Sequence, residues 1–124
     1  MTIHKRSQVI LESAARTTAQ VSGILQAGEA ICTDVVINVT LDPSTASVTP
    51  SIQGIDALGV SYTILTGAAI AATGTTVLRI GKDLTAAANV AANAMLPETW
   101  TFSMAVADAE SLTYSVTATH MTEG

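Results

Sequence analysis

The feature that most constrains this chain is the strict alternation of apolar and polar residues over short segments. It is clearest between residues 32 and 41, where Val35, Ile37 and Val39 stand at every second position. A period of two puts these side chains on one face of a β-strand, and β-branched residues favour that conformation. Turn-forming residues begin at Asp42 and end the strand.

The same pattern recurs along the chain. Residues 48–55 and 60–66 are predicted to pair antiparallel around a loop at 56–59, in which Gly59 can adopt a positive φ. Pro50 cannot donate a ladder hydrogen bond, so its strand is expected to be an edge strand or to carry a bulge there. Further strands are predicted at residues 9–18, 22–26, 75–80, 98–108 and 112–119.

The last two predicted strands are separated by the turn-forming residues 108–111. This short spacing predicts a C-terminal hairpin. Each strand has one apolar face, which we expect in the core. The core-facing residues are Trp100, Phe102, Met104 and Val106 in the first strand, and Leu112, Tyr114, Val116 and Ala118 in the second.

The Ala-rich stretch at about 84–96 breaks the pattern. Alanine favours helix, so this stretch is expected to be a loop or a short helical turn. No long amphipathic helix connects the strands, which excludes a parallel α/β fold. We therefore predict an all-β fold, an antiparallel β-sandwich or jelly roll of about eight strands. Residues 1–14 would be an N-terminal arm or first strand, and residues 15–124 a single domain.

Charge is sparse and unevenly placed. Apolar residues make up 48% of the chain and charged residues 12%, which excludes an intrinsically disordered protein. The net charge of −5 argues against nucleic-acid binding. The first 16 residues contain three basic residues, Lys5, Arg6 and Arg16, and one acidic residue, Glu12. The remainder contains two basic and nine acidic side chains. The basic end is either an arm that docks on an acidic neighbour or a solvated terminus.

The sequence contains no signal for a membrane. No apolar run approaches the roughly 18 residues that a spanning helix needs, and residues 8–15 are too short and polar for a signal-peptide core. Cys32 is the single cysteine and has no internal disulfide partner. We therefore expect folding in a reducing cytosol, without export.

Few residues are candidates for catalysis or metal binding. His4 and His120 lie near the two ends, where we expect frayed termini, and neither has a neighbouring Cys or carboxylate at metal-ligand spacing. Cys32 has no basic neighbour in the sequence to lower its pKa, so we expect a buried structural thiol. We predict no enzymatic activity, no catalytic residue, no metal site and no cofactor. The aspartates fall in predicted turns, where carboxylates accept backbone hydrogen bonds: Asp42, Asp56, Asp83 and Asp108.

Six segments follow one another in a recognisable order: IQGID (52–56), YTIL (62–65), AAIAATGTTVLRI (68–80), LTAAAN (84–89), LPETW (96–100) and LTYSV (112–116). Taken together they resemble a known family of small structural proteins of tailed bacteriophages and prophages. The similarity covers roughly residues 33–119. Glu98 stands where the family usually has a basic residue, and Ala57 where it often has proline, which suggests a different partner surface on the same fold.

The resemblance implies a β-sandwich virion protein, most simply a capsid decoration, or cement, protein. Such a protein would assemble in the host cytoplasm and stabilise the outer surface of the head by bridging major capsid subunits. It would act as a dimer or trimer, with no membrane or nucleic-acid partner. Deleting residues 1–12 is expected to weaken capsid binding and to leave the sandwich folded. The candidate capsid-contact arm comprises His4, Lys5, Arg6, Val9 and Leu11.

Two alternatives belong to other classes. A tail-tube, neck or baseplate component would assemble as a ring, and a closed hexamer in solution would favour it. A host-receptor or carbohydrate-binding module would need exposed aromatic side chains. Trp100 falls on an apolar strand face, so the sequence offers little for stacking against a sugar ring.

Overall fold

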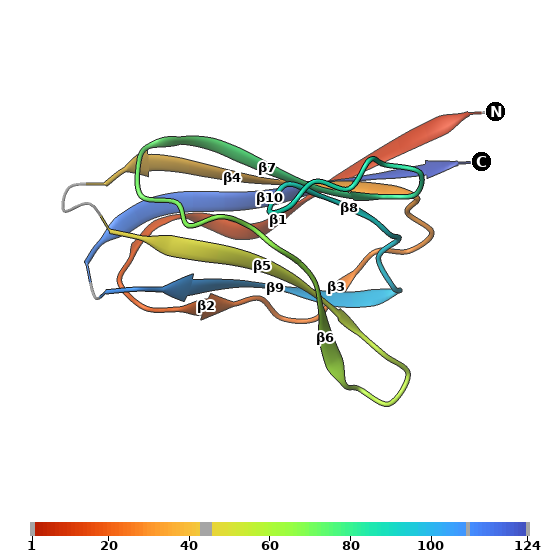
Figure 1. Ribbon diagram of the computed structural model, residues 1–124, viewed down its shortest axis with the longest axis horizontal. Coiled ribbons are helices and arrows are strands. Elements are labelled where there is room, and N and C mark those ends of the chain that lie inside the picture. Colours follow the sequence, from red (N-terminus) through yellow and green to blue (C-terminus); the bar gives the residue numbers. More distant parts are fainter. Residues whose placement is uncertain (1, 43–45, 109, 124) are drawn as a thin grey trace.

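The computed structural model describes residues 2–42, 46–108 and 110–123 and shows two five-stranded sheets packed face to face (Figure 1). Sheet A has the order β1-β10-β4-β7-β8. Sheet B has the order β2-β9-β5-β6, and β3 pairs separately with β9. The strands are β1 (Ile3–Arg16), β2 (Gln20–Val21), β3 (Leu25–Gln26), β4 (Cys32–Leu41), β5 (Val48–Ile55), β6 (Ser61–Thr66), β7 (Gly74–Gly81), β8 (Ala91–Asn93), β9 (Thr99–Val106) and β10 (Leu112–Glu123).

The all-β sandwich predicted from the alternation is confirmed. Every pairing is antiparallel except that of β7 with β8. The predicted hairpin of β5 and β6 is present, with Gly59 at a φ of +81°. The finer assignment to a jelly roll stays a prediction.

The core lies between β4 and β10 of sheet A and β5 and β9 of sheet B. Each of these strands buries alternate residues, as a period-two pattern requires. All the predicted core residues of β9 and β10 are buried, except that Val106 is half-buried at the core margin. The largest buried side chains are Trp100, Tyr114, Phe102, Ile37, Ile52, Leu78, Ile80, Met104 and Leu112.

The predicted C-terminal hairpin is wrong. β9 belongs to sheet B and pairs with β5, whereas β10 belongs to sheet A and lies between β1 and β4. The apolar faces of β9 and β10 therefore meet across the core. The connection between them crosses from one sheet to the other, and sequence proximity did not reveal this, because a short link can join two strands within a sheet or between sheets.

The prediction for Pro50 is also wrong. β5 lies between β9 and β6, so it is not an edge strand, and the bulge against β6 falls between Ile52 and Gln53. Pro50 sits beyond the last paired residue of β6, where its carbonyl accepts a hydrogen bond from the Gly67 amide (2.8 Å). Its missing N–H is tolerated because the ladder ends there.

The Ala-rich stretch forms a loop without a helical turn. Asn89 adopts a φ of +64°, which is incompatible with a continuing right-handed helix. The chain then enters β8, which pairs in parallel with Arg79–Gly81 of β7. The Asn93 carboxamide accepts a hydrogen bond from the Asp83 amide (3.0 Å) and holds the two ends of the loop together.

Residues 3–16 form the first strand of sheet A. β1 pairs with β10 along its whole length, with irregularities between Val9 and Leu11 and between Leu11 and Ala14. The first half of β1 projects outward beside the C-terminal end (Figure 1). The N-terminal segment is thus an ordinary edge strand, of which only the tip extends from the sandwich.

His120 is fully buried, so the expectation of a frayed position is wrong. The alternation of β10 continues to residue 120 and turns this side chain inward. Its Nδ1 lies 2.8 Å from the Thr33 hydroxyl, and its ring meets Trp100 edge to face at 5.8 Å. Burial, and to a lesser extent the Arg6 guanidinium, lowers the pKa of His120 to about 4.

A neutral, buried His120 predicts a specific loss of stability in acid. Because the unfolded-state pKa is 6.5 and the folded-state pKa is about 4, the unfolded chain binds the proton first as pH falls. The free energy of unfolding should therefore be fully retained above pH 6.5 and fall by about 3 kcal/mol between pH 6.5 and 4. Urea unfolding across this range measures the fall.

The carboxylates also titrate in acid, so the test compares variants. His120→Gln should show a shallower pH dependence than the unmodified chain. His4→Gln is the matched control, because it removes an imidazole at an exposed position of β1. Equal pH slopes for His120→Gln and the unmodified chain would contradict the assignment.

Candidate assembly surfaces

The first candidate surface is the outer edge of β1. Over the described residues β1 pairs only with β10, so its other edge has unpaired backbone groups. His4, Lys5, Arg6 and Val9 are exposed there. Leu11 instead packs against the core, so the structure separates it from the other residues of the candidate arm.

Two arginines anchor β1 differently. Arg6 donates hydrogen bonds to the Gln8 side chain (3.2 Å) and to the Gln26 carbonyl (3.0 Å), and the second bond ties β1 to the end of β3. Arg16 donates to backbone carbonyls within the irregular half of β1 and to the Tyr114 carbonyl (2.7 Å). Its guanidinium also lies 4.8 Å from the Tyr114 ring centre. The irregular half of β1 is therefore fixed to the body.

These contacts change what the deletion of residues 1–12 is expected to do. The deletion would remove Ile10 and Leu11 from the core margin and leave one side of β10 unpaired from Val116 onward. Loss of apolar burial and of a sheet edge destabilises a sandwich. A substitution on the exposed half of β1 is consequently a cleaner probe than the deletion.

The second candidate surface is the β5–β6 hairpin, which projects from the sandwich (Figure 1). Asp56 organises its turn: Oδ1 accepts hydrogen bonds from the amides of Leu58 and Val60, both at 2.9 Å. The backbone adds a bond from the Asp56 amide to the Val60 carbonyl (2.9 Å) and one from the Gly59 amide to the Asp56 carbonyl (3.0 Å). Four hydrogen bonds thus hold a loop of five residues in one conformation.

The hairpin tip is apolar despite its exposure. Leu58 is 89% exposed, Val60 58% and Tyr62 48%. Single exposed apolar residues are common, but Leu58 and Val60 stand on one hydrogen-bonded turn and give the tip a small apolar patch, while Tyr62 follows within β6. The sequence predicted the hairpin and missed this patch, although a turn flanked by Leu and Val was the available signal.

A small acidic hollow lies beside the turn of this hairpin, against the segment that leads into β9. It has a volume of about 310 Å³, and Asp56 and Glu98 provide its two carboxylates. Tyr62 lies close against Gly54, where an added Cβ would come within 2.6 Å of the tyrosine ring and 2.8 Å of Pro97. Gly54 therefore allows the tyrosine to pack on the strand. The remaining lining residues are Ile55, Ala57 and Thr99.

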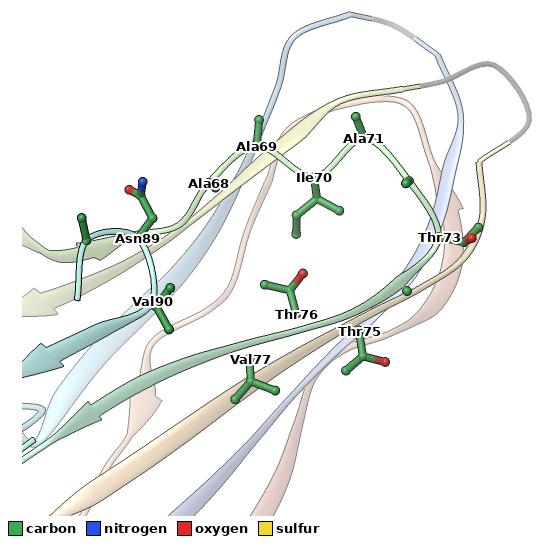
Figure 2. Close-up of a pocket in the computed structure, with 13 residues that line it drawn as sticks. Ala68, Ala69, Ile70, Ala71, Thr73, Thr75, Thr76, Val77, Asn89 and Val90 are labelled. Carbon is green, nitrogen blue, oxygen red and sulfur yellow. The ribbon is translucent and has the colours of Figure 1, made fainter. Parts of the chain in front are cut away.

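A larger, open hollow of about 520 Å³ lies beside β7 (Figure 2). Its walls are residues 68–77 and 88–90, with Ile70 and Val90 among the larger side chains and alanine the commonest residue. No charged or titratable side chain lines it among the described residues. This hollow suits apolar contact and offers no group for acid–base chemistry.

The outer face of sheet B carries hydroxyl and amide side chains. Its two central strands, β5 and β9, have no charged residue. Gln53 is its centre: its amide donates to Ser51 (2.7 Å) and Ser103 (3.0 Å), and its carbonyl oxygen accepts from Thr101 (3.4 Å). These side chains satisfy one another's hydrogen-bonding groups. The face could therefore be covered by a partner without burying an unpaired charge.

Within the described ranges, no group of three or more His, Cys, Asp or Glu residues could hold a metal ion. The same part of the chain has no helix that could cross a membrane. Cys32 is half-buried, and burial and then Asp34 raise its pKa. The structure does supply a basic neighbour that the sequence did not show, since Arg79 pairs with Asp34 (3.3 Å), but it lowers the thiol pKa by less than burial raises it.

Comparisons of the chain with protein-family models, with curated proteins and with solved structures find no match. Three surfaces distinguish the molecule: the basic edge of β1, the apolar hairpin tip and the acidic hollow beside the turn.

The rigidity of the hairpin can be tested through Gly59. Its φ of +81° is strained for any residue with a side chain, while the space around it is open. Gly59→Ala should lower the free energy of unfolding by about 1 kcal/mol. Gly23→Ala, at a glycine with equally open space and no positive φ, should change it by less than about 0.5 kcal/mol. Urea unfolding measures both, and equal effects would contradict the turn geometry.

Proposed function

We propose that this chain is a non-enzymatic structural protein that docks in many copies onto a protein shell. The most specific form of the proposal is a decoration protein on the outer surface of a tailed-phage head, where it would bridge major capsid subunits. The resemblance of residues 33–119 to small phage structural proteins supports this choice. The rest of the support comes from the shape and chemistry of the surface.

The observation that carries the proposal is the β5–β6 hairpin with its apolar tip. Leu58 and Val60 are held by the Asp56 turn, so they would enter a partner's pocket without a large loss of loop entropy. Burying one such side chain contributes about 1.5–3 kcal/mol. A preorganised apolar anchor of this kind is typical of the centre of an interface.

The rest of the surface suits modest contacts made by many copies better than one tight contact made by a single copy. The uncharged outer face of β5 and β9 can lie against a shell without the desolvation of ionic groups. Each contact can be modest, because many copies on one shell add avidity. Clamping by buried interface needs no chemistry in the protein itself.

A ring-forming component of the tail, neck or baseplate is the second candidate. It is favoured by one observation: each sheet ends in an edge strand, β1 in sheet A and β6 in sheet B, that has no further partner among the described residues. A receptor- or sugar-binding module has less support, because Trp100 is buried and cannot stack on a ligand.

The copy number of the chain in purified particles distinguishes these candidates. Quantitative mass spectrometry against the major capsid protein should give a count in the hundreds, near a simple ratio to the capsid subunit, for a decoration protein. A few to a few dozen copies would instead indicate the tail or neck. Absence from the particles would overturn both assignments.

The role of the hairpin tip can be tested on the same particles. Leu58→Asp would bring a carboxylate into the docking contact, and it should lower occupancy at least tenfold while leaving the free energy of unfolding unchanged. Val21→Asp is the control, because Val21 is also highly exposed but lies on β2, at the opposite edge of sheet B. Equal occupancy of the two variants would contradict docking through the tip.

A further inference from the structure

The first half of β1 lies beside the buried histidine of β10. Ile3–Val9 pairs with β10 in regular antiparallel register, and Arg6 stands directly opposite His120. Directly opposed residues of an antiparallel pair share one face of the sheet, so Arg6 is on the same inward face as the imidazole. Because β1 is the edge strand of sheet A, this segment is the last strand beside His120 on that side (Figure 1).

The surroundings of His120 suit a neutral ring and offer no partner for a charged one. Its Nδ1 lies 2.8 Å from the Thr33 hydroxyl of β4, and its Nε2 has no hydrogen-bond partner among the described residues. Thr33 and Trp100, which contact the ring from β4 and β9, carry no charge. On β1 the ionisable residues of this face are Arg6 and, two positions away, His4. Protonation would therefore bury an imidazolium with an unpaired N–H opposite a second cation.

The first half of β1 is the most weakly held of the strands around His120. β4 and β9 are paired on both sides and bury alternate side chains in the core. Ile3–Val9 is paired on one side only, and all its side chains are exposed except the half-buried Gln8. Beyond the backbone ladder it is fastened by the Arg6 bond to β3 and by a hydroxyl contact between Ser7 and β10 (3.2 Å). Few buried apolar contacts make a segment open at low cost in free energy.

We propose that protonation of His120 detaches Ile3–Val9 from β10 while the central strands stay paired. Departure of this segment makes β10 the edge of sheet A, so the imidazolium gains water on the side that β1 had covered. The detached segment carries Lys5 and Arg6. Acid therefore converts a fixed basic edge into a free basic arm, and this release does not depend on what the protein docks onto.

The pH range of the release follows from the two states of His120. Its pKa is about 4 while β1 is attached and returns towards 6.5 when the segment leaves. The detached state therefore binds the proton first as pH falls below 6.5, and the attached state keeps its full advantage only above that pH. Full return of the pKa to 6.5 raises the detached population about 20-fold between pH 7 and pH 5.

Amide hydrogen exchange of the full-length chain, followed by NMR between pH 7 and pH 5, tests the release. Protection factors correct for the intrinsic pH dependence of exchange, and those of the residue 3–9 amides that bond to β10 should fall about 20-fold. Urea below the unfolding transition should leave this exchange unchanged, because the opening exposes little surface. The amides between β5 and β9 should respond to urea, because they exchange when the whole sandwich unfolds. Unchanged protection of β1, or a urea dependence as steep as that of β5 and β9, would overturn the proposal.

The two histidines of this region are separated by substitution. His120→Gln should reduce the change to less than about threefold, whereas His4→Gln should retain it. The unmodified chain gives an independent measurement if His120→Gln does not fold. Its protection should begin to fall between pH 7 and pH 6, above the range in which carboxylates titrate. A fall confined to pH below 5, or one abolished by His4→Gln, would exclude His120 as the trigger.

The role of Arg6 as a fastening is tested against its neighbour. Arg6→Gln loses the bond to the Gln26 carbonyl and should speed exchange of residues 3–9 at pH 7. Lys5→Gln is the matched control, because Lys5 is opposite Met121 on the outer face of the same strand and should leave exchange unchanged. Equal effects of the two substitutions would contradict the fastening of β1 across the sandwich and with it the proposed release.

Discussion

The structure depends on the burial of four alternating strand faces against one another. β4 and β10 supply one side of the core and β5 and β9 the other. Each strand is central in its sheet, so its backbone is paired on both sides while every second side chain is removed from water. Since these central strands are rich in β-branched and aromatic residues and bury every second side chain, packing between the sheets and pairing within them favour the same register.

This arrangement leaves the edges and one hairpin available for contact. The second half of β1 is protected by irregular pairing and by the Arg16 guanidinium, both of which discourage addition of another strand. The first half of β1 pairs regularly with β10 and is held by the Arg6 guanidinium, which donates to the Gln26 carbonyl. The two halves of this edge strand are therefore anchored in different ways.

Much of the fold could be predicted because local chemistry decided it. Asp56 and Gly59 specify a turn, and the alternation around them specifies strands on both sides. The candidate surfaces were harder to predict. The sequence alone identified Lys5 and Arg6 as part of a basic end. The exposure of Leu58 and the proximity of Glu98 to Asp56 depend instead on where the β5–β6 hairpin lies relative to a distant segment of the chain.

The sequence by itself determined the fold class, the inward residues of the central strands and the turns, because each follows from interactions within a few residues. The tertiary structure alone decided which strands became neighbours. β9 and β10 are adjacent in sequence yet lie in opposite sheets, and His120 is buried because β4 and β9 bring Thr33 and Trp100 to it. Strand pairing joins residues far apart in the chain, and its free energy depends on the whole core rather than on any single segment.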